Sequence, residues 1–107
     1  MLATTVDLEA LGRIGIALAD ESRRQLLVAL LEGPGYPAEL AERFGLSKAN
    51  VSNHLACLRG CGLVATTSEG RRVRYALADP RFATALTQLV DLALAPAGGC
   101  AHDRAAR

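Results

Sequence analysis

Apolar residues recur three or four positions apart over five stretches of the chain, which is the spacing of amphipathic helices. The first stretch follows a capping residue, either Thr5 or Asp7, and the second lies between Asp20 and Gly33. The apolar stripe of the first consists of Leu8, Leu11, Ile14 and Leu18. The remaining predicted helices cover residues 37–44, ended by Gly45, residues 48–62, capped by Ser47, and residues 81–95, between Pro80 and Pro96.

After Gly62 the spacing changes to alternation, which predicts β-strands in place of a helix. The two strand candidates are residues 63–67 and 71–77, joined by a turn at residues 68–70. In the second strand an apolar face alternates with a basic one, formed by Val73, Tyr75 and Leu77 against Arg72, Arg74 and Ala76. A short helix, a glycine turn, a capped helix and a hairpin are typical of a winged helix-turn-helix.

We therefore expect a mainly α fold with a small β-hairpin, in which about five helices carry a two-stranded wing. Residues 1–96 would form one DNA-binding and dimerisation domain, and residues 97–107 a flexible C-terminal tail. A domain this small is only marginally stable alone, and dimer formation would bury more of its surface.

The composition predicts a cytoplasmic protein with reduced thiols. Half of the 107 residues are apolar, but no run is long enough to span a bilayer, so we expect no membrane contact. The first 13 residues lack the basic and apolar blocks of a signal peptide. The three cysteines are an odd number, which disfavours a disulfide framework in the cytosol.

Positive charge is concentrated in one segment. Residues 43–75 hold six basic residues and one acid, whereas the rest of the chain holds six basic and ten acidic residues. This distribution is typical of a face that binds nucleic-acid phosphates, and an ordinary solvated surface is the alternative.

The second helix of a helix-turn-helix enters the major groove with its N-terminal residues towards the bases. The candidate DNA-binding residues on that helix are Ser47, Lys48, Asn50, Ser52, Asn53 and His54. Those on the wing are Arg71, Arg72 and Arg74, which would hold the DNA backbone or a minor groove. Ser47 also serves as a helix cap, and His54 is interpreted as a packing or phosphate-contacting residue. The predicted partner is double-stranded operator DNA.

Catalysis is not indicated. His54 and His102 have no evident acid partner, and Glu39 and Glu42 are interpreted as solvated residues of a short helix. No glycine-rich loop is present that would cradle a phosphate. We expect a binding protein and not an enzyme.

The sequence resembles the ArsR-type metalloregulatory repressor family. The stretches that carry the resemblance are ALADESRRQLLVALLEG at 17–33, LSKANVSNHLACLRGCGLV at 46–64 and EGRRVRYALAD at 69–79. The CLRGC pair, Cys57 and Cys61, and a cysteine in the tail are similar to the cadmium- and lead-sensing CmtR branch of that family. The resemblance implies a homodimer joined by its first and last helices. Such a dimer binds a palindromic operator when metal-free and releases it when metal binds.

The candidate metal ligands are Cys57, Cys61 and Cys100. Cys57 and Cys61 lie four residues apart, so they share one helix face and can bind a single ion. Cys100 would add a third bond from the tail. Three thiolates favour soft ions, with cadmium or lead preferred and arsenite possible. Zinc would need a fourth ligand, which His102 could supply.

The basic surroundings, including Arg59, are expected to favour thiolate over thiol. Because metal binding releases protons, the metal response should weaken at low pH. Other metal sites of the family are absent: no Cys-x-Cys pair occurs between Asp20 and Leu46, and the last helix offers no matching ligands at Arg81, Leu92 and Ala95. Two alternatives keep the same fold: an arsenite sensor on the three thiols, and a thiol redox sensor in which Cys57 and Cys61 oxidise.

Overall fold

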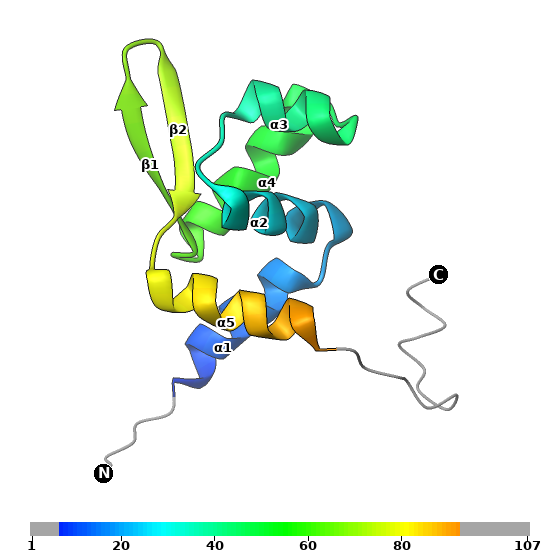
Figure 1. Cartoon of the computed structure of the whole chain (residues 1–107), viewed down its shortest axis with the longest axis vertical. Coiled ribbons are helices and arrows are strands. Elements are labelled where there is room, and N and C mark those ends of the chain that lie inside the picture. The colour runs from blue at the N-terminus through cyan, green and yellow to red at the C-terminus, as the bar shows by residue number, and fades with distance from the viewer. Residues whose placement is uncertain (1–6, 93–107) are drawn as a thin grey trace.

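The computed structural model describes residues 7–92, which form five helices and one two-stranded antiparallel hairpin (Figure 1). In chain order the elements are α1 (Leu8–Leu18), α2 (Glu21–Glu32), α3 (Pro37–Phe44), α4 (Lys48–Gly60), β1 (Val64–Glu69), β2 (Arg72–Leu77) and α5 (Pro80–Asp91). The helix-turn-helix is formed by α3 and α4, and the hairpin is its wing. This arrangement confirms the expected fold class.

Side-chain caps begin four of the helices where the sequence predicts them. Asp7, Asp20, Ser47 and Asp79 each accept a hydrogen bond from a backbone N–H two or three residues later, at 2.8–3.0 Å. For α1, the cap is Asp7; Thr5 lies outside the described residues. Gly45 ends α3 in a left-handed conformation with φ of 66°, which a residue without a side chain adopts at little cost.

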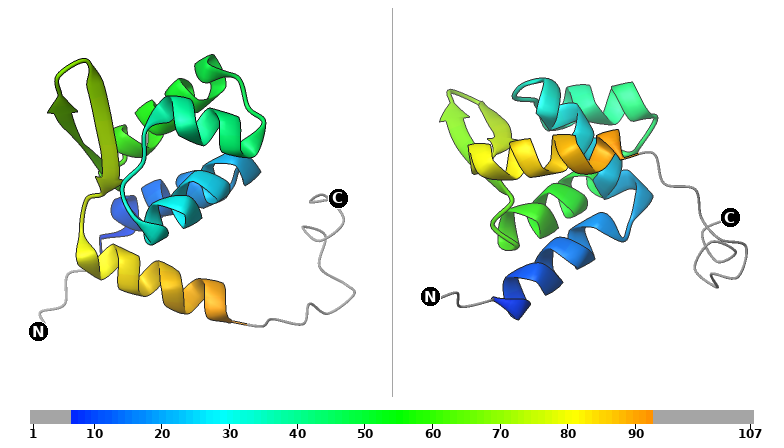
Figure 2. Two further views of the ribbon diagram at one scale, coloured as in Figure 1. Left: turned by 45° about the horizontal axis from the view of Figure 1, so that its top comes forward. Right: turned by 60° about the horizontal axis from the view of Figure 1, so that its bottom comes forward.

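The core lies between α2, α4 and the base of the hairpin. Its most deeply buried large side chains are Leu26, Leu27, Val51, Leu55 and Leu58. The last three form the predicted apolar stripe of α4, which the structure confirms. Figure 2 shows that the wing projects at the end of the molecule that carries α3 and α4, whereas α5 lies at the other end. The polar face of α4 is thus left free beside the wing.

Two predicted boundaries are wrong by a few residues. The fourth helix ends at Gly60 and not at Gly62, so Cys61 is its C-cap. The hairpin pairs Val64 with Leu77 through Glu69 with Arg72, which leaves a two-residue turn at residues 70–71 and extends β1 by two residues. Gly70, with φ of 63°, permits this tighter turn. The strands are longer than predicted towards the turn because backbone hydrogen bonding between them continues to Glu69 and Arg72.

The predicted apolar face of the second strand is only partly correct. Tyr75 and Leu77 pack against the core, but Val73 is exposed because the tip of the wing extends beyond the helices. The last helix ends at Asp91 within the described residues. Leu92 is its C-cap and has extended backbone, so the prediction that this helix continues to residue 95 is wrong. Residues 93–95, the domain limit at residue 96 and the tail at 97–107 lie outside the described residues.

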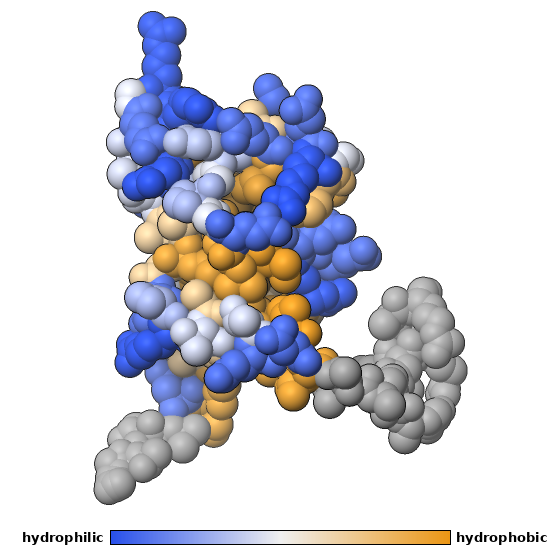
Figure 3. Space-filling view, in the orientation of Figure 1, coloured by the Kyte–Doolittle hydropathy of each residue, from blue (hydrophilic) through white to orange (hydrophobic). Residues whose placement is uncertain are grey.

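Several large apolar side chains of α1 and α5 face outwards. Leu8 and Leu11 of α1 are 73% and 58% exposed, so the other residues of the 7–92 segment leave the N-terminal half of the predicted stripe uncovered. Leu89 and Val90 of α5 are 50% and 54% exposed. Figure 3 shows apolar surface between α2 and α5 and at the far end of α5. Within residues 7–92 no helix is both long and apolar enough to cross a membrane.

Candidate nucleic-acid interface and thiol pair

The outer face of α4 presents short polar and basic side chains. Lys48, Asn50, Ser52 and Asn53 are exposed, whereas the opposite face of the helix is buried in the core. Ser47 caps the helix through its Oγ, which accepts the Asn50 N–H at 3.0 Å. Free backbone N–H groups and the helix dipole make such an N-terminus attractive to phosphates. This face can therefore offer hydrogen bonds to bases and charge to a DNA backbone.

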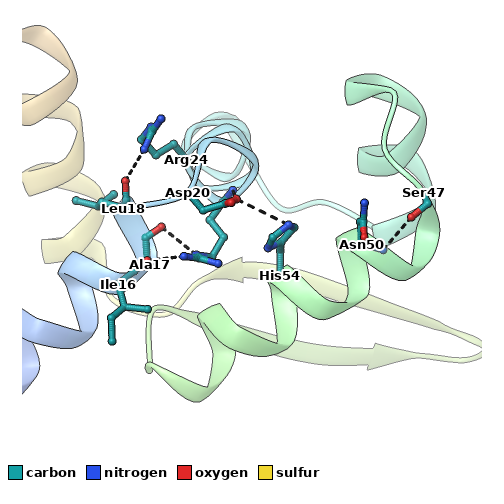
Figure 4. A network of polar contacts seen from close by, with 9 residues as sticks. Ile16, Ala17, Leu18, Asp20, Arg24, Ser47, Asn50 and His54 are labelled. Carbon is teal, nitrogen blue, oxygen red and sulfur yellow. Dashed lines mark hydrogen bonds and ion pairs between the residues drawn. The ribbon is translucent and has the colours of Figure 1, made fainter. Parts of the chain in front are cut away.

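His54 lies apart from the other polar candidates of α4. It is half-buried, and its Nε2 is 3.8 Å from Oδ2 of Asp20, the cap of α2 (Figure 4). The pKa of Asp20 is lowered, chiefly by the hydrogen bond from the Arg23 N–H and also by the charges of His54 and Arg23. His54 thus points towards α2, which agrees with its interpretation as a packing residue.

The three wing arginines have different surroundings. Arg71 is exposed at the turn and has no ion pair with any residue of the 7–92 segment. Arg72 donates from Nη2 to Oε2 of Glu39 at 2.7 Å, and its guanidinium carbon lies 3.5 Å from the centre of the Tyr36 ring. Nε of Arg74 lies 3.2 Å from Oε2 of Glu69, an ion-pair distance without hydrogen-bond alignment.

A shallow groove runs between the wing and the helix-turn-helix. It is lined by Tyr36, Pro37, Ala38, Lys48, Ser52, Arg71, Arg72 and Val73. Four of the predicted DNA-binding residues therefore lie around one depression, although they come from α4 and from the hairpin. Sequence reasoning missed Tyr36 and Glu69 and interpreted Glu39 as merely solvated. Their contacts join positions more than 30 residues apart, for which the local pattern gives no signal.

The second predicted site is the thiol pair at the C-terminal end of α4. Cys57 and Cys61 are both half-buried free cysteines, and Cys57 is close enough to influence the pKa of the Cys61 thiol. The Cys61 N–H also donates to the Cys57 carbonyl at 3.0 Å, which fixes the cap residue one turn beyond its partner. Two sulfur donors so close together can bind one soft ion.

The expectation that the surroundings favour thiolate is wrong for Cys61. Burial raises the pKa of the Cys61 thiol, and the adjacent Cys57 raises it further through charge and a hydrogen bond. Arg13 and Arg23 lower it, but with smaller effects. The cations near this thiol thus come from α1 and α2, not from the sequence neighbour Arg59.

A third ligand for the thiol pair is not found within the 7–92 segment, where no three His, Cys, Asp or Glu side chains are grouped to hold a metal. The predicted third ligand, Cys100, and the accessory His102 lie outside the described residues. A complete site would therefore need a donor from elsewhere in the chain, from a second subunit or from solvent.

Comparison with known proteins identifies the family. Residues 20–66 match the family described as bacterial regulatory protein, arsR family. Over 95 residues the chain is 58% identical to the HTH-type transcriptional regulator CmtR of Mycobacterium tuberculosis, covering 89% of this chain and 80% of that protein. The chain belongs to the ArsR family. This membership makes it a DNA-binding transcriptional regulator and not an enzyme.

Solved structures of ArsR-family proteins agree with this fold. The NMR structure of the cadmium metal-sensor CMTR from Mycobacterium tuberculosis is 57% identical, with a TM-score of 0.66, and the match covers 83% of this chain and 95% of that one. The homodimeric winged helix-turn-helix domain of Mb0332 from Mycobacterium bovis, a possible ArsR-family regulator, is 28% identical. Its TM-score is 0.74, and the match covers 84% of this chain and 87% of that one.

Proposed function

We propose that this ArsR-family protein is a metal-responsive transcriptional repressor. As a homodimer it binds operator DNA when metal-free and releases the DNA when a soft metal ion binds its cysteine thiolates. The observation that carries the proposal is the position of the thiol pair. Cys57 and Cys61 lie at one end of α4, and the exposed polar residues lie at the other. An ion bound at one end acts on the helix that reads DNA at the other.

The DNA-binding surface consists of the exposed residues of α4 together with the wing. Asn50, Ser52 and Asn53 have the hydrogen-bonding groups to read base edges in the major groove. Lys48, Ser47 and the helix N-terminus contact phosphates. On the wing, Arg71 is free for the backbone, while Arg72 and Arg74 are already paired with acids of this chain. His54 supports the position of α4 through Asp20.

The donor set fits a soft metal ion. Cys57 and Cys61 would hold it, and Cys100 would supply the third thiolate, with His102 as an accessory ligand for zinc. Bound metal supplies a positive charge that keeps the thiols deprotonated and ties their positions together. Cadmium or lead is the proposed effector. This choice is supported by the similarity to the cadmium metal-sensor CMTR and by the preference of sulfur for soft ions.

The exposed apolar side chains of α1 and α5 support a homodimer formed through the first and last helices. The similar winged helix-turn-helix domain of Mb0332 is homodimeric, which also supports a dimer. Because the partner is double-stranded operator DNA, we place the protein in the cytoplasm.

The experiment begins with the metal-free protein and a random library of DNA duplexes, from which bound sequences are selected. Binding of a selected duplex is then followed by fluorescence anisotropy during a cadmium titration. We expect an inverted repeat in the selected duplexes and a loss of affinity of about tenfold or more with cadmium, within the range of allosteric coupling. Cys57→Ser and Cys61→Ser should bind the duplex normally and ignore cadmium. Cys100→Ser shows whether the tail takes part.

Different failures have different meanings. If no duplex is selected, the protein does not act as a repressor. If the duplex binds but cadmium and lead have no effect, the metal proposal is wrong; release by arsenite or by peroxide would then identify the arsenite or the redox alternative.

A further inference from the structure

The wing is attached to the start of α3 by contacts along its length. At its base, Gly35 and Tyr75 exchange two backbone hydrogen bonds of 2.8 Å, which form an isolated antiparallel bridge. Nearer the tip, the Tyr36 hydroxyl donates to Oε1 of Glu69 at 2.6 Å. The hairpin is therefore held against the helix-turn-helix at both its base and its tip.

Arg72 is held from two directions by the same part of the chain. Its guanidinium lies over the Tyr36 ring at 3.5 Å and pairs with Glu39 at 2.7 Å. A planar guanidinium suits this combination, since it stacks on an aromatic face while its edge donates hydrogen bonds. The hydrogen bond to Glu69 also raises the pKa of Tyr36, so its hydroxyl remains a donor at neutral pH. The ring that carries Arg72 is itself fixed.

Arg71 and Arg72 are neighbours with opposite surroundings. Arg71 lies at the two-residue turn, lines the groove beside Lys48 and Ser52, and has no ion-pair partner among the described residues. Arg72 would have to leave both Glu39 and the Tyr36 ring to reach a phosphate. One arginine is thus available for DNA, and the other is committed to the protein.

We propose that Tyr36, Glu39 and Arg72 are positioning residues that fix the wing, and that Arg71 is the wing residue that contacts the DNA backbone. This inference rests on the proposed DNA binding and assigns separate roles within it. The wing is then presented to DNA at a fixed angle to α4, so that Arg71 and the α4 residues engage the same duplex together.

Substitution of Glu39 provides a test, because two explanations predict opposite changes in the affinity for DNA. If only charge matters, Glu39→Gln removes a negative charge beside a DNA-binding surface and strengthens binding. If Glu39 positions the wing through Arg72, the same change releases the wing and weakens binding to the selected duplex. We expect weakening of about threefold to fivefold, the range of a half-exposed ion pair. Binding to an unrelated duplex, which needs no fixed wing, should not weaken.

Arg71→Gln and Arg72→Gln form a matched pair, because the chemical change is the same at adjacent positions. The measurement is the affinity for the selected duplex over a series of salt concentrations. For Arg71→Gln we expect the slope of log affinity against log salt to shrink by about 0.9 in magnitude, as for one lost phosphate contact. For Arg72→Gln we expect the wild-type slope with an affinity about fivefold lower. The Glu39→Gln/Arg72→Gln double variant should lose no more than either single variant.

The proposal is overturned if Arg72→Gln flattens the salt slope as much as Arg71→Gln, or if Glu39→Gln tightens binding. Thermal unfolding of each variant shows whether it is folded; Tyr36→Phe, which keeps the ring under Arg72, is a milder second variant that should weaken only specific binding. If the wild type selects no duplex, the repressor function itself fails. If the wild type binds its duplex but the salt slope shrinks for Arg72→Gln and not for Arg71→Gln, only the roles assigned here are contradicted.

Discussion

At the scale of single residues, the chemistry of the thiol pair is governed by burial more than by charge. Cys61 is half-buried at the end of α4, and its raised pKa reflects first the loss of hydration and then the neighbouring Cys57. The thiol is therefore protonated at neutral pH, and a metal ion must displace its proton in order to bind.

This protonation predicts a steep pH dependence of cadmium binding. While Cys61 remains protonated in the free protein, each pH unit should raise cadmium affinity by about tenfold or more, because at least one proton is released per ion. The affinity is measured between about pH 6 and about pH 8 by thiolate-to-metal charge-transfer absorbance in competition with a chelator. Cys61→Ser is the control and should bind weakly with a shallower slope. A flat profile for the wild type would show that the thiol is already ionised.

Residue-level signals in the sequence predicted local contacts and missed distant ones. The caps at Asp20 and Ser47 depend on a backbone N–H three residues away, so a short motif contains all that they need. The pKa of Cys61 instead depends on packing and on cations of α1 and α2, which no nearby residue indicates. The same reason explains why Arg72 could be predicted as a wing arginine but not as the partner of Glu39.

At the scale of elements, helix starts were predicted more accurately than helix ends. Asp20, Ser47 and Asp79 mark helix starts because their side chains cap the first turn, whereas α4 was predicted to continue to Gly62 but stops at Gly60. The strand limits were also inexact, because pairing across the hairpin extends as far as the turn permits. The spacing of apolar residues was enough to predict which elements exist and in what order. The ends of the elements depend on hydrogen bonding, which that spacing does not show.

The C-terminal end of α1 provides an element-scale prediction. This helix has no basic residue in its last turn, and two arginines of α2 take that place. Arg23 donates to the carbonyls of Ile16 and Ala17 at 2.7 and 3.3 Å. Arg24 donates to that of Leu18 at 2.7 Å (Figure 4). Arg23→Met should lower the free energy of unfolding by about 1–2 kcal/mol, since it leaves two carbonyls without a charged donor.

Urea unfolding followed by circular dichroism measures this loss, at one fixed protein concentration because a dimer's stability depends on it. Arg24→Met is the matched control; it removes one such bond and should cost less. Equal losses for the two variants would contradict the assignment of the larger role to Arg23.

At the scale of the whole molecule, the thiol pair lies between two surfaces with different proposed roles. The wing and the helix-turn-helix form one end, and α1 and α5 lie away from it (Figures 1 and 2). Both of these helices carry outward-facing apolar residues. Cys61 is close enough to Arg13 of α1 and Arg23 of α2 for their charges to act on its pKa. An ion held there would bind α4, the proposed DNA-reading helix, close to α1, which belongs to the proposed dimer interface.

The proposed dimer leads to the last prediction. Leu89 is half exposed on α5 beside Val90. Burial of such apolar surface against a partner subunit would stabilise the dimer by roughly 25 cal/mol for each Å². Leu89→Glu should raise the dimer dissociation constant by roughly a hundredfold or more, because two-fold symmetry places the unpaired charge in the interface twice. Sedimentation velocity over a range of concentrations measures the change. Val73→Glu, which alters an exposed apolar residue of the wing, should leave the dimer intact. If Leu89→Glu sediments as the wild type does, α5 is not in the interface. If it becomes a monomer, its affinity for an inverted-repeat duplex should fall with it, since one subunit contacts only one half-site.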